Sequence, residues 1–163
     1  MSIEFEDNTV KIMDALADNL SAFMHEIGGE ITEQARRIVR VDTGKTKGSY
    51  EYKVRESAMA GEAEVQIGSD MENAIWEEYG TGEYALHGDG RKGGWYIPEE
   101  KLTENAKSKM KKVIGKNGKV YYYTRGKKPV QPLKKAFEKT EPKIQKQMVN
   151  IVKESIGGGV SFD

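Results

Sequence analysis

Two short stretches decide the fold: Val-Asp-Thr-Gly at residues 41–44 and Glu-Glu-Tyr-Gly-Thr-Gly at residues 77–82. Each follows a predicted regular element and reaches glycine, which adopts positive φ without steric cost. The Asp and Thr side chains beside these glycines can hydrogen-bond the local backbone and stabilise a tight turn. We therefore predict two structural corners. Their residues are Asp42, Thr43, Gly44, Glu78, Tyr79, Gly80 and Thr81.

The two acidic corner residues, Asp42 and Glu78, have a specific predicted role. An ionised carboxylate makes a stronger hydrogen bond than a neutral acceptor. We expect both carboxylates to accept backbone N–H groups and so to hold the corners.

Before the first corner, apolar residues recur at helical spacing from about residue 8 to residue 40. This pattern predicts one long amphipathic helix, with a kink at Gly28 and Gly29 because glycine weakens a helix interior. Between the corners, residues 49–57 and 62–69 alternate apolar and polar positions. Such alternation predicts a two-stranded hairpin with one solvated face.

After the hairpin, Asp70 is expected to cap a short helix that Gly80 ends. Residues 83–94 are rich in glycine and charge and predict a mobile surface loop. From residue 95 to the C-terminal helix, the sequence predicts a series of short helices, strands and turns. We predict a strand at 95–97, a helix at 99–114, a turn at 115–118, a strand at 119–125, a helical turn from Pro132 and a closing helix capped by Thr140.

These elements predict an α+β fold: a small, mainly antiparallel sheet packed by a long N-terminal helix and a C-terminal helix. Residues 1–156 are expected to form a single domain, and residues 83–128 a basic helix and hairpin insertion within it. Residues 157–163 are expected to form a flexible tail.

Composition limits the class of protein. Hydrophobic residues make up 37% of the 163 residues and charged residues 32%, an apolar supply that suits subunits completing their burial against copies of themselves. Residues 1–83 carry 8 Lys or Arg and 18 Asp or Glu, a net charge of −10, whereas residues 84–163 carry 18 and 8, a net of +10. The two halves can neutralise each other within one subunit, or between neighbours in a head-to-tail ring.

The sequence contains no convincing set of catalytic or metal-binding residues. There is no cysteine, so thiolate chemistry and disulfides are excluded. Asp42-Thr43-Gly44 matches the letters of an aspartic protease but follows a basic helix end, and Gly44-Lys45-Thr46 lacks the earlier glycine of a phosphate-binding loop because Val39 occupies that position. His25, and His87 with Asp89, supply too few ligands for zinc. We expect no enzyme activity, no cofactor and no metal.

Targeting signals are also lacking. The acidic N-terminus does not resemble a signal peptide, and no apolar run approaches the length of a membrane-spanning helix. We expect a soluble protein made in the cytoplasm, without a membrane partner.

One basic stretch suggests a ligand. Residues 105–137 contain no acid, and Tyr121, Tyr122 and Tyr123 lie among many cations. Basic residues interleaved with aromatics can bind a nucleic acid, although a solvated basic face explains the same pattern. The alternative function is therefore a small DNA-binding protein. Its contact residues, or those of a protein interface, are Lys107, Lys111, Lys112, Lys116, Arg125, Lys127 and Lys128.

The order of these elements resembles the tail-component family of long-tailed bacteriophages, the tail-completion or head-tail joining proteins. The resemblance rests on five motifs in order along residues 10–155. They are Val41-Asp42-Thr43-Gly44 with Ser49, Ile67-Gly68-Ser69, Glu78-Tyr79-Gly80-Thr81, Thr124-Arg125-Gly126 and Gln131-Pro132-Leu133. Thr46 stands where the family usually has an apolar residue, and the segment 83–128 is longer than in compact members.

This resemblance implies a structural virion protein of the tail or neck. Such a protein assembles as a ring, which we expect to be a hexamer, at the head-proximal end of the tail tube. The implied partners are copies of itself, the head-tail connector and the tail tube proteins, with DNA passing through the lumen.

Overall fold

The computed structural model describes residues 9–56 and 62–157 and has an α+β fold, as the sequence predicts. Contacts within the chain divide it into two compact units. The first takes its described residues from 9–34, 51–56, 62–68 and 135–157, and the second from 35–50 and 69–134. The predicted tail after Gly157 and the junction between the hairpin strands at residues 57–61 lie outside the described residues.

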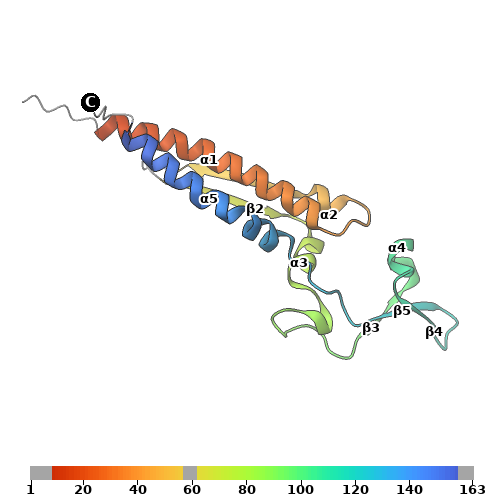
Figure 1. The fold of residues 1–163 in the computed structure, drawn as a ribbon. Coiled ribbons are helices and arrows are strands. Elements are labelled where there is room, and N and C mark those ends of the chain that lie inside the picture. The colour runs from red at the N-terminus through yellow and green to blue at the C-terminus, as the bar shows by residue number, and fades with distance from the viewer. Residues whose placement is uncertain (1–8, 57–61, 158–163) are drawn as a thin grey trace, which may run out of the picture. The chain divides into compact units, whose positions relative to one another are not determined.

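Two long helices and a hairpin make up the first unit (Figure 1). Helix α1 spans Thr9–Ile38 and helix α5 spans Pro132–Gly157, while strands β1, Tyr50–Glu56, and β2, Ala63–Ser69, form a two-stranded antiparallel sheet. Both views of the ribbon show α1 running beside α5 and beside the sheet. The predicted long helix and hairpin are confirmed.

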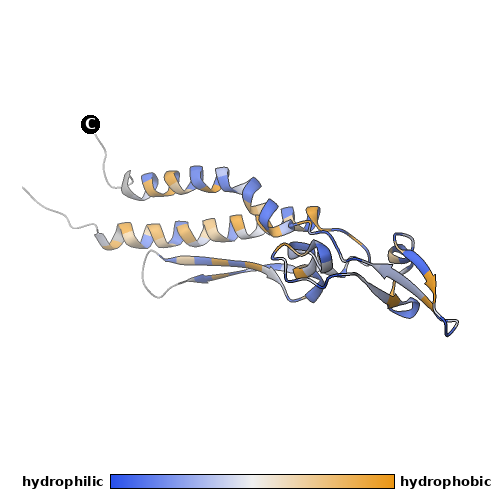
Figure 2. Ribbon diagram, turned by 90° about the horizontal axis from the view of Figure 1, so that it is seen from below, coloured by the Kyte–Doolittle hydropathy of each residue, from blue (hydrophilic) through white to orange (hydrophobic). Residues whose placement is uncertain are grey.

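The core of the first unit follows the apolar stripe of α1, which Figure 2 shows as orange positions recurring along the helix. Leu20, Phe23, Ile27 and Ile31 are buried. Their spacing of three or four residues places them on one helix face. Burial of this face, rather than intrinsic helix propensity, stabilises so long a helix in water.

Polar side chains join α1 to α5 along the edge of this core. The Lys143 Nζ lies 2.9 Å from Glu26 Oε1 and 2.5 Å from Glu30 Oε2. Hydrogen bonds to Glu30 and Glu26 raise the pKa of Lys143 above its ordinary value. Further along, Lys139 Nζ donates to Gln34 Oε1 at 3.1 Å. These pairs set the register between the helices, although partly exposed ion pairs contribute little net stability.

Gly28 has a packing role. Helix α1 continues through Gly28 and Gly29 as one helix. A Cβ at Gly28 would lie 2.6 Å from Tyr52 Cδ2 and 2.8 Å from Val65 Cγ2, whereas at Gly29 the nearest such atom is 3.8 Å away. The absent side chain of Gly28 therefore lets the sheet approach the helix closely.

Helix α5 differs from the prediction at its start. We expected a separate helical turn from Pro132 and a closing helix capped by Thr140. Instead α5 is one helix with Pro142 inside it, and Thr140 Oγ1 donates to the Ala136 carbonyl oxygen at 2.9 Å. A Thr hydroxyl can bond the preceding helical turn as readily as it can cap a new one, so the sequence pattern did not distinguish the two.

The second unit contains short elements and a three-stranded antiparallel sheet of order β3-β5-β4. Its helices are α2, Lys45–Gly48, α3, Glu72–Tyr79, and α4, Glu104–Lys107; its strands are β3, Trp95–Pro98, β4, Lys111–Ile114, and β5, Val120–Thr124. Short 3₁₀ turns span Gly82–Tyr84 and Glu99–Lys101. The predicted strands at 95–97 and 119–125 are confirmed.

The predicted helix at 99–114 is wrong. Only residues 104–107 of the described segment are α-helical, and Thr103 Oγ1 caps them by accepting the Ala106 N–H at 3.2 Å. Residues 111–114 instead pair with β5 in a hairpin whose turn is closed by the Gly115 N–H on the Lys119 carbonyl. Pairing with a strong tyrosine-rich strand overrides a weak helical spacing.

The start of α3 also differs from the prediction. Its N-cap residue is Met71 rather than Asp70, and no side chain caps it. The Ser69 Oγ accepts the Met71 N–H at 3.0 Å, so Ser69 rather than Asp70 supplies the side-chain hydrogen bond just before this helix.

Replacing Gly28 by alanine should destabilise the protein by about 1–3 kcal/mol, because the new methyl group overpacks the contact with Tyr52 and Val65. Gly29→Ala is the matched control and should stabilise by up to about 1 kcal/mol, since alanine favours a helix interior. Urea unfolding of both variants measures the difference. Equal stability of the two would show that the sheet does not pack closely on Gly28.

Candidate functional site

The centre of the second unit is a buried carboxylate, Glu77. Its side chain is 1% exposed, and Oε2 lies 3.0 Å from Arg40 Nε while Oε1 lies 2.5 Å from Lys127 Nζ. The backbone oxygen of Glu77 also accepts the N–H groups of Val130 and Gln131. Because each carboxylate oxygen has a cationic partner, the charge is compensated where water is excluded.

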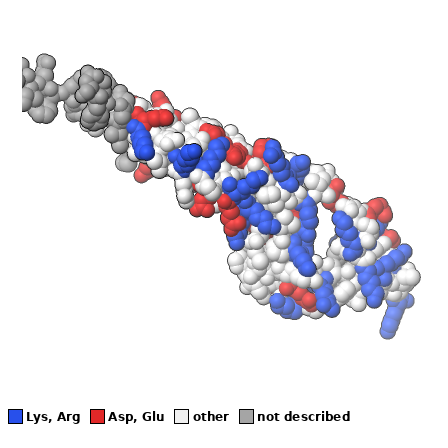
Figure 3. Space-filling view, in the orientation of Figure 1, with Lys and Arg blue, Asp and Glu red and all other residues white. Residues whose placement is uncertain are grey.

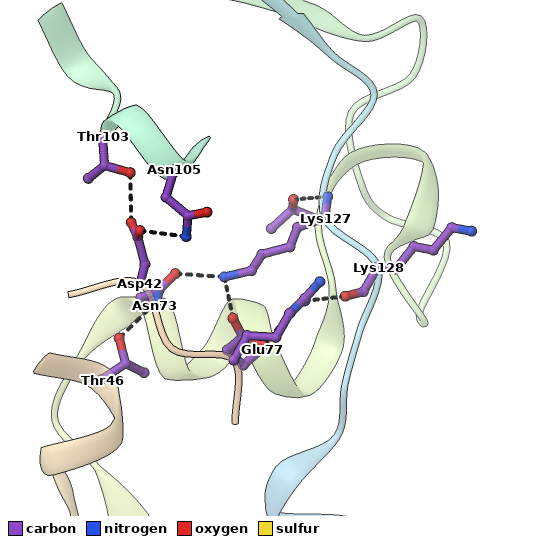
Figure 4. Close-up of polar contacts among 10 residues, drawn as sticks. Asp42, Thr46, Asn73, Glu77, Thr103, Asn105, Lys127 and Lys128 are labelled. Atoms are coloured by element: carbon purple, nitrogen blue, oxygen red, sulfur yellow. Dashed lines mark hydrogen bonds and ion pairs between the residues drawn. The ribbon is translucent and has the colours of Figure 1, made fainter. Parts of the chain in front are cut away.

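The same contacts join three segments that are far apart in the sequence (Figure 4). Lys127 Nζ also donates to Asn73 Oδ1 at 3.1 Å, and Asn73 in turn donates to Thr46 Oγ1 at 2.8 Å. Arg40 donates to the Lys128 carbonyl at 2.6 Å. The end of α1, helix α3 and the segment after β5 thus share one polar network, which we call the Glu77 network.

The second corner lies directly on this network. Gly80 ends α3 with φ of 75°, and a Cβ there would meet the Lys127 carbonyl oxygen at 2.9 Å. Thr81 pairs with Lys127 twice: its N–H donates to the Lys127 carbonyl, and its Oγ1 accepts the Lys127 N–H, both at 2.9 Å. The predicted requirement for glycine at this corner is confirmed.

Glu78 fulfils its predicted role. Its two carboxylate oxygens accept the N–H groups of Leu133 and Lys134 at 2.9 Å and 3.1 Å. These groups belong to the first turn of α5, where backbone N–H groups lack partners within the helix and the helix dipole favours negative charge. The corner therefore caps the helix that begins at Pro132.

The first corner contains the predicted left-handed glycine, Gly44, with φ of 81°. The prediction for Asp42 is wrong in its partners. Its carboxylate accepts from the side chains of Thr103, at 2.8 Å, and Asn105, at 2.9 Å, rather than from backbone N–H groups. These hydrogen bonds, that from Asn105 first, lower the pKa of Asp42. Thr43 Oγ1 lies 3.5 Å from the Lys45 N–H, so its contribution to the turn is weak.

A pocket of about 590 Å³ lies within the second unit and is lined by both corners and by the Glu77 network. Its apolar wall includes Trp76, Trp95 and Met110. Asp42 is exposed and hydrogen-bonded to an amide and a hydroxyl. This setting differs from the shared-proton pair of acids that an aspartic protease requires.

The predicted basic contact residues divide into two groups. Lys127 belongs to the Glu77 network, Lys107 lies 2.6 Å from Glu104, and Lys128 lies over the Tyr84 ring at 5.4 Å. The remaining residues are exposed on or beside the β4–β5 hairpin. They are Lys111, Lys112, Lys116 and Arg125.

The two histidines and Tyr79 of the second corner complete the set of residues singled out in the sequence. His25 is exposed on α1, and the centroids of its ring and the Tyr52 ring lie 5.9 Å apart in a T-shaped arrangement. The Tyr79 side chain is 48% exposed, and its ring lies 5.3 Å from that of His87. Within residues 9–56 and 62–157, no group of three or more His, Asp or Glu side chains is arranged to hold a metal ion. None of the helices formed by those residues has the length and apolarity to span a membrane.

Sequence reasoning missed the most buried member of the site. Glu77 shares a face of α3 with buried Ala74, three residues earlier. An acid on the apolar side of a short helix was a signal that a cationic partner was needed, but nothing in the sequence identified Arg40 and Lys127 as those partners.

Comparison with protein-family models, curated proteins and solved structures finds no match to this chain.

Glu77→Gln should destabilise the protein by about 2–3 kcal/mol, less than the usual cost of breaking a fully buried pair because Arg40 and Lys127 are partly exposed and can rehydrate. Glu100→Gln, an exposed residue of the same unit, is the control and should change stability by less than about 0.5 kcal/mol. Urea unfolding measures both. Equal effects would mean that the buried carboxylate does not hold the network together.

Tyr50 generates a prediction about alkaline pH. Its side chain is fully buried, and its hydroxyl has no hydrogen-bond partner among the described residues. Burial, with smaller contributions from Glu78 and Glu77, raises the pKa of Tyr50 from 10.0 to about 12. The folded state therefore holds this proton more tightly, so its contribution to stability is complete below pH 10 and is lost as the pH rises to about 12.

Tyr50→Phe should remove this loss, and at neutral pH it should be neutral or stabilising by up to about 1 kcal/mol, because it deletes an unsatisfied buried hydroxyl. Urea unfolding at a series of alkaline pH values tests this, with exposed Tyr96→Phe as the control. If the free energy of unfolding fell equally with rising pH in wild type and in Tyr50→Phe, the loss of stability would not come from Tyr50.

Proposed function

We propose that this chain is a structural virion protein of a long-tailed bacteriophage or prophage, which completes the tail or joins it to the head by ring-type oligomerisation. The ordered motifs that resemble the tail-component family support this proposal. Two of these motifs, the second corner and Thr124-Arg125-Gly126, lie close together in the structure. Thr81 of the corner hydrogen-bonds Lys127, the residue that follows Gly126, so each motif helps to hold the other in place.

The observation that carries the proposal is the apolar exposure of α3. Ile75 is 57% exposed, Trp76 41% and Tyr79 48%, and Leu86, whose N–H bonds the Tyr79 carbonyl, is 50% exposed. We call these four residues the α3 apolar surface. Aromatic and large apolar side chains gathered at a surface are typical of protein interfaces. The ion pairs of Glu77 fix α3 within the second unit, so this surface is held rigid before association.

A second copy of this chain is the partner that we infer. The opposite net charges of residues 1–83 and 84–163 favour association of unlike surfaces. Unlike contacts repeated around an axis produce a closed ring. On α5, Met148, Val149 and Val152 are 36%, 52% and 44% exposed. We assign this α5 strip as the surface that meets the α3 apolar surface of the next copy.

Light scattering coupled to size exclusion tests the ring. Wild-type protein should form an assembly that weakens as salt rises, whereas Trp76→Glu and Val149→Glu should each give monomers. Mixing these two variants should give a dimer that cannot grow, because one intact pair of surfaces remains in the mixture. Ile114→Glu, which places the same charge at a residue 70% exposed on β4, is the control and should assemble like wild type.

Several outcomes would contradict these assignments. Assembly of Trp76→Glu at wild-type concentration would exclude the α3 apolar surface, and the absence of a dimer in the mixture would exclude the pairing of unlike surfaces. Wild-type protein that stays monomeric at every concentration and salt would count against self-assembly. Particles made without this polypeptide but with normal, infectious necks would contradict the tail function itself.

A further inference from the structure

The strand register separates the three-stranded sheet into two different faces. Tyr123 lies opposite Tyr96 of β3 and opposite Lys111 of β4. Directly paired residues project to the same side of a sheet, and residues two apart on one strand do so as well. Tyr96, Lys111, Tyr121 and Tyr123 therefore share one face, which we call the tyrosine face. Tyr122 projects to the opposite side.

The two faces differ in exposure. The Tyr122 side chain is 7% exposed and belongs to the core, whereas Tyr96 on the tyrosine face is 59% exposed. The rings of Tyr96 and Tyr123 lie 5.3 Å apart at 54°. Tyr123 is held in place because its hydroxyl donates to the Gly93 carbonyl at 3.2 Å. The exposed face thus presents an ordered pair of aromatic rings.

Positive charge surrounds these rings. Five cations and no acid occur between residues 111 and 125: Lys111, Lys112, Lys116, Lys119 and Arg125. Of these, Lys112 pairs with Tyr122 and therefore projects to the opposite face. Lys111 is exposed beside Tyr123. Arg125, two residues after Tyr123, is also exposed, and its Nη1 lies 3.9 Å from Glu83 Oε2. Figure 3 shows Lys and Arg side chains gathered over the β4–β5 hairpin. A polyanion would therefore meet aromatic rings and cations on one face.

We propose that the tyrosine face binds single-stranded nucleic acid. Unpaired bases stack on exposed aromatic rings, while neighbouring Lys and Arg bind the phosphates. A duplex hides the faces of its bases within its own stack, so it can use the cations but not the rings. An acidic protein segment has the same limitation. This surface lies beyond the proposed ring assembly and does not depend on it.

Fluorescence anisotropy with a labelled oligothymidine of about 12 nucleotides, a length that suits one binding module, tests the proposal on the full chain. Wild-type protein should bind this probe in low salt. Tyr96→Leu, which keeps the apolar bulk, should weaken binding about tenfold, while Tyr96→Trp should retain it. Tyr84→Leu removes a tyrosine that is 37% exposed in a 3₁₀ turn outside the three strands, and should have no effect. Lys111→Gln should reduce the slope of log affinity against log salt by about 0.7.

The contrary results are equally specific. Wild-type affinity in Tyr96→Leu would mean that only charge is involved and would overturn stacking. A duplex of the same length that binds as tightly as the single strand, or polyglutamate that binds directly and loses affinity with Tyr96→Leu, would assign the face to another partner. No anisotropy change with wild type at low salt would also overturn the proposal. Circular dichroism melts of Tyr96→Leu and Tyr96→Trp establish that both variants are folded.

Discussion

The second unit depends on one interaction, the burial of the Glu77 carboxylate between Arg40 and Lys127. A buried charge without a partner is far more costly than any single contact that it makes. Once α3 places Glu77 inside, the end of α1 and the segment after β5 must approach it from either side. The backbone bonds of Thr81 with Lys127, and of Glu77 with Val130 and Gln131, then fix the path of that segment up to α5.

The parts of the fold that were predicted correctly are those encoded by a long local period. Helix α1 and the hairpin strands β1 and β2 repeat their pattern often enough to exclude other structures. Residues 99–114 do not repeat a pattern often enough to exclude other structures. Their four apolar residues at helical spacing, Leu102, Ala106, Met110 and Val113, also fit short turns followed by a strand. The pairing of β4 with β5 decides between these structures, and pairing is a property of two segments together. The predicted N-cap at Thr140 was wrong for a similar reason. A Thr hydroxyl can hydrogen-bond the backbone either as a helix cap or from a position inside a helix.

In the candidate site, too, locally encoded features were predictable and long-range pairings were not. Gly44 and Gly80 were predictable because positive φ is a local requirement. Glu78 was predictable as an acceptor, although its donors at the start of α5 lie 55 and 56 residues away. The partners of Asp42 were not, because Thr103 and Asn105 reach it from a segment whose structure had been predicted incorrectly. Local backbone chemistry could be inferred from sequence, whereas long-range side-chain pairing could not.

The Glu77 network also changes what the charge of the chain can do. Lys127 and Arg40 count as surface cations in the sequence, but both pair with the same buried acid, which offsets one of their two charges. Lys107 is likewise balanced by Glu104. The positive charge free to meet a partner is therefore concentrated on the β4–β5 hairpin, beside exposed tyrosines. Exposed apolar side chains lie also on α3, which the same network holds rigid. A surface ordered before binding loses less entropy on association, so the buried carboxylate favours binding without contacting any partner.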